Sequence, residues 1–344
     1  MSITIDGIIF SLQRHGGISV YFRELLQFLA ARQQPVALTL EPPLIQSAPA
    51  QATSVTERPA RTLERYRRAR VAASARVFHS SYYRQPARAG LPTVVTVHDF
   101  IYERFRRGPA RWVHMAQKHA AIRSAQAVIC ISESTRQDML HWVGEIPGQQ
   151  VHVIHNGVSP SFHRLADGAA PAGAAPFALF VGERRGYKNF GLALQALERL
   201  PGIDLHCVGG GPIAADELAG VPAATAARVR HLGYVTDAAL NEHYNRALCL
   251  LYPSRYEGFG IPVVEAMRAG CPVVCIDCAA VLEVGGDALV IAQAEPAALA
   301  EAVLRIAEPA ARTAMIQAGM RIAQRYDWAR THEQTLAIYR QLGA

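Results

Sequence analysis

Residues 252–274 read YPSRYEGFGIPVVEAMRAGCPVV and carry strand, loop and helix signals in close succession. The apolar run that ends at Tyr252 predicts a buried strand, and residues 253–260 have the proline and glycines of a turn. Pro262 suits the first turn of a helix, which residues 263–269 continue until Gly270 ends it. A glycine-bearing loop that enters a helix N-terminus offers unpaired N–H groups, which favour a phosphate ligand.

Two glutamates accompany this loop, Glu257 within it and Glu265 in the first turn of the predicted helix. Carboxylates beside a phosphate site need a reason, because like charges repel. The simplest reason is a ligand that also carries hydroxyl groups, so that Glu265 binds a ribose and Glu257 a sugar. A lone glutamate is usually a solvated charge, but here the loop, the helix and both carboxylates indicate the same ligand.

The segment 257–274 resembles the signature of retaining glycosyltransferases of family 4, which have the GT-B fold of two Rossmann-like domains. In that family the second glutamate binds the nucleotide ribose, and the first lies by the donor sugar and the diphosphate. The resemblance implies these roles for Glu265 and Glu257. It also implies donor contacts for the backbone between them, at Gly258, Phe259, Gly260 and Ile261.

A second basic loop, GERRGYKN at 182–189, separates a predicted strand at 177–181 from a predicted helix at 190–200. An arginine and a lysine at the start of a helix form an electrostatic clamp for a diphosphate. Arg184 and Lys188 resemble the pair that binds the donor diphosphate in family 4. Arg185 is the neighbour that would compete with Arg184 for this role.

The N-terminal half offers candidates of the same kind. A short apolar strand predicted within 3–10, a loop with Gly16 and Gly17, and a predicted helix at 18–31 form the opening of a doubly wound unit. An ordinary tight turn would also explain the glycines, but the family has a similar loop beside its donor site. His98 ends the predicted strand 93–97, where open α/β sheets bind ligands, and it resembles the family's donor-sugar histidine.

Weaker candidates rest on the resemblance alone. Tyr234 and Val235 follow a turn that abuts the nucleotide base in the family, and Glu283 resembles a loop glutamate near the ribose or phosphate. Ser132 resembles a serine of the family's cleft, although a helix N-cap explains it equally well. The predicted catalytic residues are His98, Arg184, Lys188 and Glu257.

The length of 344 residues predicts two domains in an α/β GT-B fold, with parallel sheets facing a central cleft. Residues 1–159 would be a Rossmann-like acceptor-binding domain and 160–325 a Rossmann-like nucleotide-sugar-binding domain. Residues 326–344 would form a helix that packs back on the N-terminal domain. Pro- and Ala-rich stretches predict a loop at 41–59 and a linker at 165–176.

The charge of the chain is uneven. Residues 1–159 hold 19 lysines and arginines against 10 acidic residues, and the segment 61–76 predicts a basic surface helix. This balance suggests peripheral contact with an anionic membrane, although a solvated arginine-rich surface explains it as well. No apolar run long enough for a membrane span and no signal peptide is evident, which favours a cytoplasmic protein.

The cysteines and acidic residues give little sign of a metal. Cys271, Cys275 and Cys278 have a spacing also used for iron–sulfur clusters, but they flank a predicted buried strand and suggest small buried thiols. The sequence has no D-x-D pair. We therefore expect a metal-independent site without a cofactor, in which protein cations take the place of the metal ion.

These observations favour a hexosyltransferase of bacterial O-antigen, capsule or lipopolysaccharide synthesis. We expect a GDP-sugar donor such as GDP-mannose first and a UDP-sugar second, with a glycan or lipid-linked saccharide as acceptor. Two alternatives remain, a GT-B sugar-nucleotide epimerase and a non-catalytic protein that binds membranes or nucleic acid. The paired clamp and glutamates disfavour the second, so we expect no nucleic-acid partner.

Overall fold

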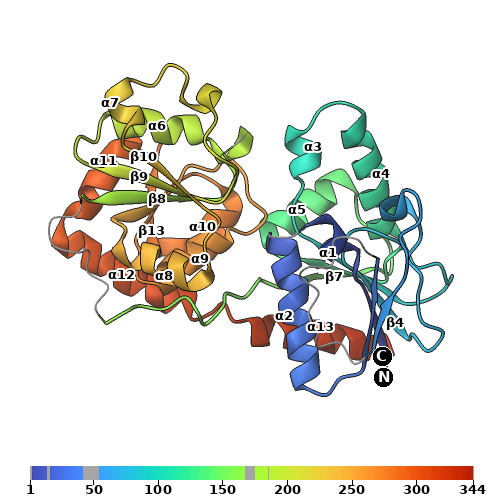
Figure 1. Ribbon diagram of the computed structural model, residues 1–344. Helices are drawn as coiled ribbons and strands as arrows, with labels where there is room; N and C mark the ends of the chain where they lie inside the picture. Colours follow the sequence, from blue (N-terminus) through green and yellow to red (C-terminus); the bar gives the residue numbers. More distant parts are fainter. Residues whose placement is uncertain (1, 14–15, 42–53, 167–174, 185, 344) are drawn as a thin grey trace. The chain divides into compact units, whose positions relative to one another are not determined.

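The computed structural model describes residues 2–13, 16–41, 54–166, 175–184 and 186–343 (Figure 1). The chain divides into two compact units, each with its own sheet. Unit 1 comprises residues 1–157 and 327–344, and unit 2 comprises residues 158–326. Both sheets are parallel throughout, which confirms the predicted α/β class of two Rossmann-like domains.

Unit 1 contains a seven-stranded sheet with the strand order β3-β2-β1-β4-β5-β6-β7. Its strands are β1 (Ile3–Asp6), β2 (Val36–Leu40), β3 (Ser54–Glu57), β4 (Val77–Ser80), β5 (Thr93–Val97), β6 (Ala127–Cys130) and β7 (Gln150–Val153). Its helices are α1 (Ile8–Leu12), α2 (Gly17–Ala31), η1 (Glu64–Tyr66), α3 (Ile101–Phe105), α4 (Pro109–Ser124), α5 (Glu133–Trp142) and α13 (Trp328–Gln341).

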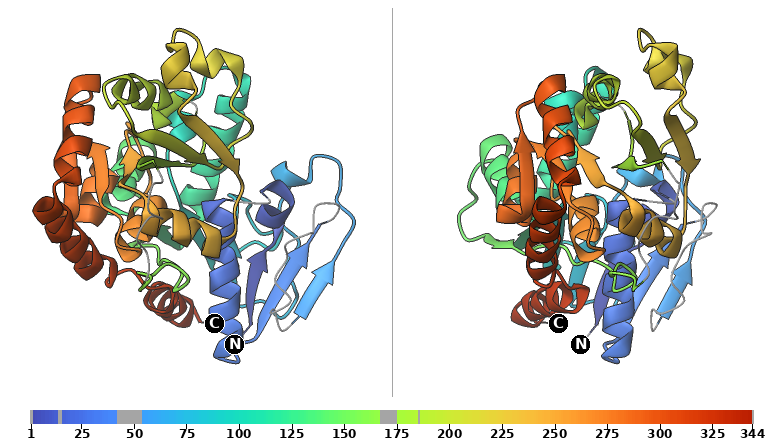
Figure 2. Two further views of the ribbon diagram at one scale, coloured as in Figure 1. Left: turned by 60° about the vertical axis from the view of Figure 1, so that its left-hand side comes forward. Right: turned by 90° about the vertical axis from the view of Figure 1, so that its left-hand side faces the viewer.

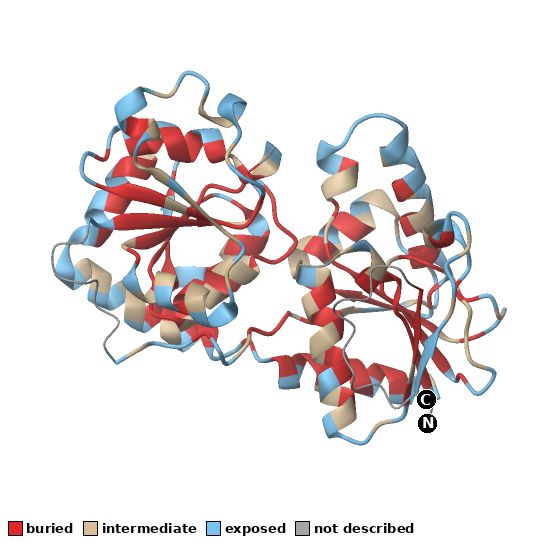
Figure 3. Cartoon of the chain, in the orientation of Figure 1, coloured by how far each residue is buried: buried red, intermediate tan, exposed pale blue. Residues whose placement is uncertain are grey.

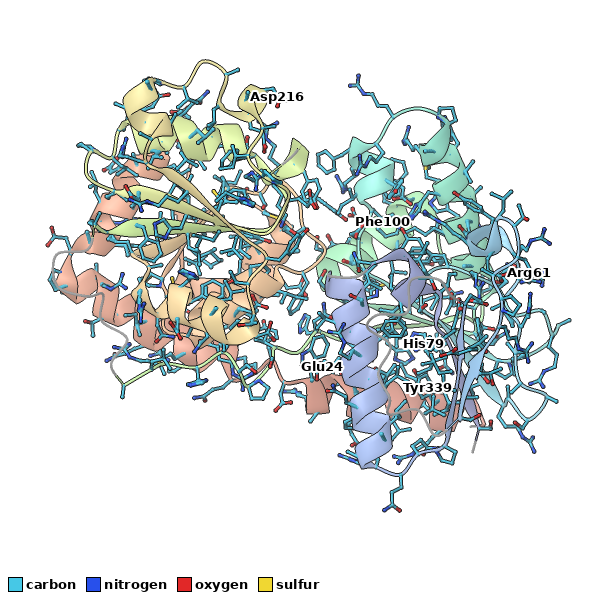
Figure 4. All side chains as sticks on the ribbon, in the orientation of Figure 1. Glu24, Arg61, His79, Phe100, Asp216 and Tyr339 are labelled. Atoms are coloured by element: carbon cyan, nitrogen blue, oxygen red, sulfur yellow. The ribbon has the colours of Figure 1, made fainter. Side chains whose placement is uncertain are left out.

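The last helix, α13, belongs to the core of unit 1. Trp328, Leu336, Ile338 and Tyr339 are buried in one apolar cluster with side chains of α2 and β1. Figures 1 and 2 show α13 beside α2, and in Figure 4 the side chains of Tyr339 and His79 of β4 meet. The predicted return of the C-terminal helix to the N-terminal domain is therefore confirmed.

Unit 2 contains a six-stranded sheet with the strand order β10-β9-β8-β11-β12-β13. Its strands are β8 (Phe177–Val181), β9 (Asp204–Val208), β10 (Val229–Gly233), β11 (Cys249–Tyr252), β12 (Val273–Ile276) and β13 (Leu289–Ala292). Its helices are η2 (Gly186–Lys188), α6 (Phe190–Glu198), η3 (Ala215–Leu218), α7 (Ala223–Ala226), α8 (Asp237–Arg246), α9 (Ile261–Arg268), α10 (Ala279–Gly285), η4 (Gly286–Ala288), α11 (Pro296–Ala307) and α12 (Pro309–Ala323).

Burial follows the layer pattern of a doubly wound fold. The central strands of both sheets are buried on both faces, whereas the covering helices expose their outer side (Figure 3). This explains why the strands read as short continuous apolar runs rather than as alternating patterns.

Several predicted elements differ from the structure. The short strand expected within 3–10 is β1, which ends at Asp6, but the helix α1 at residues 8–12 was not predicted. The basic helix expected at 61–76 is wrong, since only Glu64–Tyr66 is helical, as a single 3-10 turn. Part of the loop expected at 41–59 is the edge strand β3. Residues 42–53 and 167–174, within the predicted loop and linker, lie outside the described residues.

Candidate functional site

The order of the unit 2 sheet locates the predicted donor residues. The strand sequence reverses between the neighbours β8 and β11, with β9 and β10 on one side and β12 and β13 on the other. Loops that leave two such strands diverge to opposite faces, which opens a crevice at the carboxyl edge of the sheet. Lys188 follows β8 and Glu257 follows β11, so both belong to this edge.

The structure brings Lys188 and Glu257 together. The Lys188 ammonium lies 2.7 Å from Glu257 Oε1 and donates a hydrogen bond to the Tyr252 hydroxyl at 3.0 Å. Both charged residues are buried, Lys188 to 8% exposure and Glu257 to 9%. Burial and the Glu257 carboxylate raise the pKa of Tyr252 well above its usual value, so this phenol keeps its proton. The two loops are also joined by the backbone, through Arg255 N–H and the carbonyl of Tyr187 at 2.8 Å.

Arg184 is bonded to the glycine turn after β9. Its Nε donates to Glu217 Oε1 at 3.0 Å, Nη1 donates to the Gly209 carbonyl at 3.0 Å, and Nη2 donates to the Gly211 carbonyl. Its side chain is only 3% exposed. Gly210 in this turn has a φ of +67°, and a Cβ there would lie 2.9 Å from Arg184 Nη1. A diphosphate would have to replace one of these partners, and Arg185 lies outside the described residues.

The loop from Gly258 enters α9 as the sequence predicts. Gly260 is the N-cap with a φ of +98°, and Pro262 lies in the first turn. Phe259 is buried and packs edge-on against Tyr326 at a centroid distance of 5.5 Å, which anchors the loop. In this first turn Pro262 has no N–H and the Val263 N–H donates to the Gly260 carbonyl at 2.9 Å. The Ile261 N–H and the positive end of the helix dipole are therefore what the turn can offer an anion.

Glu265 lies in the second turn of α9, which corrects the expectation of the first turn, because the helix begins at Ile261. Its Oε2 accepts a hydrogen bond from the hydroxyl of Tyr244 at 3.0 Å. Burial raises the pKa of Glu265 to about 7, the nearby Asp237 carboxylate adds to the shift, and the Tyr244 hydroxyl opposes it. Glu257 and Glu265 thus have different partners within the same loop and helix.

The candidates of the N-terminal half lie in unit 1. Gly17 begins α2 and Gly16 is its N-cap, whose carbonyl accepts from Ser19 Oγ at 2.9 Å. His98 directly follows β5 and packs edge-on against Tyr21 of α2, with a centroid distance of 5.3 Å. Unit 1 therefore brings the glycine loop and the histidine to the same end of its sheet.

His98 is 7% exposed, and its Nε2 is buried without a hydrogen-bond partner among the described residues. Burial, helped by the charge of Lys118, lowers the pKa of His98 to about 3, so its imidazole is neutral. Asp99 Oδ1 accepts from the N–H of Ile101, the first residue of α3, at 3.0 Å.

The turn at His98 is held by the buried ion pair of Lys118 and Glu103, which was not predicted from the sequence. Lys118 is 1% exposed and donates to the Asp99 carbonyl and to Glu103 Oε2. Its Nζ lies 3.6 Å from the centre of the Phe100 ring. Glu103 also contacts His119 at 3.2 Å. A lysine is rarely buried, so nothing in the sequence around Lys118 predicts its burial or its partner Glu103.

The remaining candidates lie in separate elements and differ in burial, from the exposed Tyr234 to the fully buried Ser132. Tyr234 is 64% exposed and Val235 half-buried, after β10. Glu283 lies in helix α10 and not in the predicted loop, because Ala279–Gly285 continues without a turn residue. Ser132 accepts from the N–H of Thr135 at 2.9 Å and is thus an N-cap.

The six cysteines are buried free thiols. Burial raises the pKa of Cys271 and of Cys275 to about 12, which opposes thiolate formation. Across the described ranges, no three or more His, Cys, Asp and Glu side chains are grouped so as to hold a metal ion. In the same ranges, no helix combines the length and the apolar character needed to cross a membrane.

Comparison with protein families gives two matches that together cover most of the chain. A model described as "Glycosyltransferase Family 4" matches residues 15–162, and one described as "Glycosyl transferases group 1" matches residues 175–308. The alpha-maltose-1-phosphate synthase of Mycobacterium tuberculosis is 31% identical over 288 residues, 74% of each chain. The O-antigen chain mannosyltransferase B of Escherichia coli is 36% identical over 116 residues, 33% of this chain and 30% of that protein.

Solved structures share the fold over nearly the full length. A sucrose-phosphate synthase from Thermosynechococcus elongatus aligns with a TM-score of 0.80 and 20% identity, covering 99% of both chains. WaaG, a glycosyltransferase involved in lipopolysaccharide biosynthesis, aligns with a TM-score of 0.74 and 15% identity, covering 98% of this chain and 99% of that one. HepE of Anabaena, solved with UDP and glucose, aligns with a TM-score of 0.72 and 16% identity, covering 98% of each.

Proposed function

Because the chain belongs to glycosyltransferase family 4, with the GT-B fold, we propose that it transfers a hexose from a nucleotide sugar to a glycan hydroxyl. The proposed reaction retains the anomeric configuration and needs no metal ion. The observation that supports the proposal is that a buried lysine, the N-terminus of α9 and the Glu265 carboxylate belong to the loops and the helix that follow β8 and β11 of the unit 2 sheet.

We propose GDP-mannose or another GDP-hexose as the donor, with UDP-sugars as the second choice. Two similar proteins support mannose, the O-antigen chain mannosyltransferase B and a phosphatidyl-myo-inositol mannosyltransferase that is 34% identical over 230 residues. The Anabaena neighbour with UDP and glucose supports the alternative. A lipid-linked saccharide of bacterial surface polysaccharide synthesis is the proposed acceptor.

In the proposed mechanism, positive charge stabilises the diphosphate as it leaves. Lys188 and the positive N-terminal end of α9 would bind its oxygens, where negative charge develops in the transition state. The arriving phosphate would share Lys188 with Glu257, and Glu257 would then accept a hydrogen bond from the donor sugar. We assign no nucleophile.

The other candidates have supporting roles in the proposal. Glu265 would hold the ribose, and Tyr234 and Val235 would lie by the base. Arg184 would contact the diphosphate if it exchanges one of its present acceptors. For His98, Gly16 and Gly17 we propose donor-sugar contacts on the family resemblance alone. The neutral imidazole of His98 suits a hydroxyl or carbonyl partner, because its Nε2 is unpaired in the described structure.

Thermal unfolding with a panel of GDP, UDP, TDP, ADP and CMP, each with a chelator present, tests the proposal. A nucleotide at 100 times its dissociation constant adds about 2.7 kcal/mol of stability. A shift by GDP alone supports a metal-independent GDP-sugar transferase, and a shift by UDP alone changes the donor. The absence of any shift, or a shift that needs divalent metal, contradicts the proposal, and donor turnover without acceptor would indicate an epimerase.

We further propose that unit 1 contacts an anionic membrane through the α3–α4 face. We use this name for the exposed apolar side chains on and beside these helices and the arginines among them: Leu63, Tyr66, Phe105, Trp112, Val113, Arg67, Arg68, Arg104, Arg106 and Arg107. Trp112 is 62% exposed and Leu63 69%. The carbonyl of Arg65 accepts from Gln117 of α4 at 2.7 Å, which places the 61–70 segment beside α4. Aromatic and cationic side chains together suit a lipid interface.

Sedimentation with vesicles tests this surface. Vesicles with anionic phospholipid should bind the protein in low salt and release it in high salt, and neutral vesicles should not bind it. Trp112→Ser with Arg106→Ser should weaken binding at least tenfold. Leu304→Ser is the matched control, because Leu304 is 51% exposed on unit 2. Equal binding by the double variant and the control would contradict the proposal.

A further inference from the structure

The hydroxyl of Tyr244 connects a fully buried ring of α8 to the proposed ribose carboxylate on α9. Tyr244 has 0% exposure and packs edge-on against Phe162 at a centroid distance of 5.9 Å. Its hydroxyl donates to Glu265 Oε2 at 3.0 Å. A ring enclosed in this way cannot change rotamer without displacing its neighbours, so the position of Oε2 is fixed by the packing of α8.

The other carboxylate oxygen is in a different situation. Glu265 is only partly buried, and within the described chain no protein group bonds to its Oε1. A carboxylate has about four acceptor positions, so one oxygen can be held by the protein while the other binds a ligand hydroxyl. The arrangement thus divides Glu265 into a fixed oxygen and an available one.

We infer that Tyr244 is a positioning residue, which holds Glu265 so that its free oxygen meets a ribose hydroxyl of the donor nucleotide. This inference rests on the proposed function and adds a residue that the family signature at 257–274 does not contain. Tyr244 itself would not touch the ligand. Its contribution would be the orientation and the charge state of Glu265.

The ionisation of Glu265 should make nucleotide affinity depend on pH. The groups that act on the Glu265 carboxyl are Tyr244 and Asp237, both of α8. The elements packed against α9 carry further titratable side chains: Glu242, His243 and Arg246 of α8, Glu283 of α10, Arg312 and Arg321 of α12, Cys249 and Tyr252 of β11, and Cys275 of β12. A hydrogen bond from Tyr244 favours the ionised form, which is the better acceptor for a hydroxyl.

The test compares a ribonucleotide with its deoxy analogue. Calorimetry would measure the affinities of GDP and of 2′-deoxy- and 3′-deoxy-GDP from roughly pH 5.5 to 8.5, with the UDP series instead if UDP is the stabilising nucleotide. The wild-type protein should prefer GDP to one of the deoxy analogues by about tenfold or more, since a carboxylate that loses its hydroxyl partner is left unpaired. Affinity for GDP should rise as the pH passes through about 7.

Tyr244→Phe removes only the hydroxyl. We expect a three- to tenfold loss of GDP affinity, a reduced preference over the deoxy analogue, and a pH midpoint shifted upward. Glu265→Gln should lose both the preference and the pH dependence. Tyr339→Phe is the matched control, because Tyr339 is equally buried and its hydroxyl bonds to His79 of unit 1. It should retain the wild-type preference and midpoint.

Two results would overturn the inference. If Tyr244→Phe lowers the melting temperature but keeps the wild-type preference and pH midpoint, Tyr244 only packs α8 against α9. If the wild-type protein binds GDP and both deoxy analogues equally, Glu265 makes no ribose contact, and Tyr244 cannot position it for one. Absence of binding by every nucleotide would instead refute the proposed function, so the two failures are distinguishable.

Discussion

At the scale of single residues, the buried ammonium of Lys188 contacts two oxygen acceptors. Its ammonium is paired with Glu257, and the phenol of Tyr252 accepts its hydrogen bond. A buried charge is tolerable only when it is paired, so each partner stabilises the other against desolvation. The pair keeps a cation at the carboxyl edge of the sheet before any phosphate arrives.

Replacement of Lys188 therefore has two separable effects. Lys188→Met should lower the free energy of unfolding by about 2–4 kcal/mol, because Glu257 is left buried without its counter-ion. Transfer should fall by at least about 100-fold in kcat/KM, because the positive charge at the diphosphate is lost. Urea denaturation and a transfer assay measure the two quantities.

The double variant Lys188→Met with Glu257→Gln separates the two effects. It should recover most of the stability and none of the activity, since neither charge is then buried. Near-normal turnover in either variant would contradict the proposed role of Lys188. A double variant as unstable as the single one would contradict the energetic coupling of the pair.

Glu265 should give the protein a pH-dependent stability of defined sign. Its pKa is raised from 4.5 to about 7, so the folded chain binds this proton more tightly than the unfolded chain. The resulting stabilisation is fully present below about pH 4.5 and is lost as the pH rises through about 7. Urea denaturation of wild-type protein and Glu265→Gln at pH values below and above this window should show the wild type losing up to about 3 kcal/mol relative to the variant. A constant difference would contradict the raised pKa.

The residues that the sequence reveals are those with local signals. The glycines and Pro262 predict the loop and α9 because turn and N-cap preferences depend on adjacent residues. Tyr244 and Tyr252 carry no such signal, since Tyr252 ends an apolar run like any core aromatic and Tyr244 stands among polar helix residues. Their partners are 21 and 64 residues away in the chain, so the pairing emerges only from the packing of α8 and of β11.

At the scale of elements, the local sequence pattern predicted the wrong secondary structure for segment 61–76, where buried charges determine the path of the backbone. The basic segment at 61–76 has helical composition, yet Glu64 accepts from the backbone and side chain of Arg61 and pairs with the fully buried Arg84. Asp6 and Glu41 also pair with Arg84. This buried cluster fixes the segment in a non-helical path, and no feature within 61–76 indicates it.

The start of α13 makes a close backbone contact that is open to a direct test. A Cβ at Gly157 would lie 2.2 Å from the Trp328 nitrogen and 2.5 Å from its Cα, which are backbone atoms that cannot rotate away. Gly157→Ala should therefore displace α13 and lower the free energy of unfolding by about 1–3 kcal/mol or more, as measured by urea denaturation.

Gly191→Ala in helix α6 is the matched control for this contact. A Cβ at Gly191 meets nothing within 4 Å, so alanine should stabilise the helix by up to about 1 kcal/mol. Equal effects of the two substitutions would show that the contact at Trp328 is unimportant.

At the scale of the whole molecule, the two units differ in how the chain builds them. Unit 2 is one continuous segment with its own apolar core between sheet and helices, whereas unit 1 needs α13 from the far end of the chain. The parallel sheets could be predicted from the sequence, since alternating strands and helices favour them. The edge strands β3, β10 and β13 were not predicted: β3 fell in the expected loop, residues 231–233 of β10 in an expected turn, and β13 after the last expected strand. The polar strand β3 is defined by its pairing with β2 rather than by its own composition.

This asymmetry predicts that unit 2 folds alone and retains the nucleotide site. Lys188, Glu257, Glu265 and the N-terminus of α9 all belong to residues 158–326, so a fragment with these bounds should unfold cooperatively and be stabilised by the same nucleotide as the full chain. Residues 1–157 alone should fail to fold, because the buried Trp328, Leu336 and Tyr339 would leave a large cavity beside α2. Calorimetric unfolding of both fragments, with and without nucleotide, measures this. A folded 158–326 fragment that ignores a nucleotide which stabilises the full chain would place essential nucleotide contacts in unit 1, contrary to the proposed site.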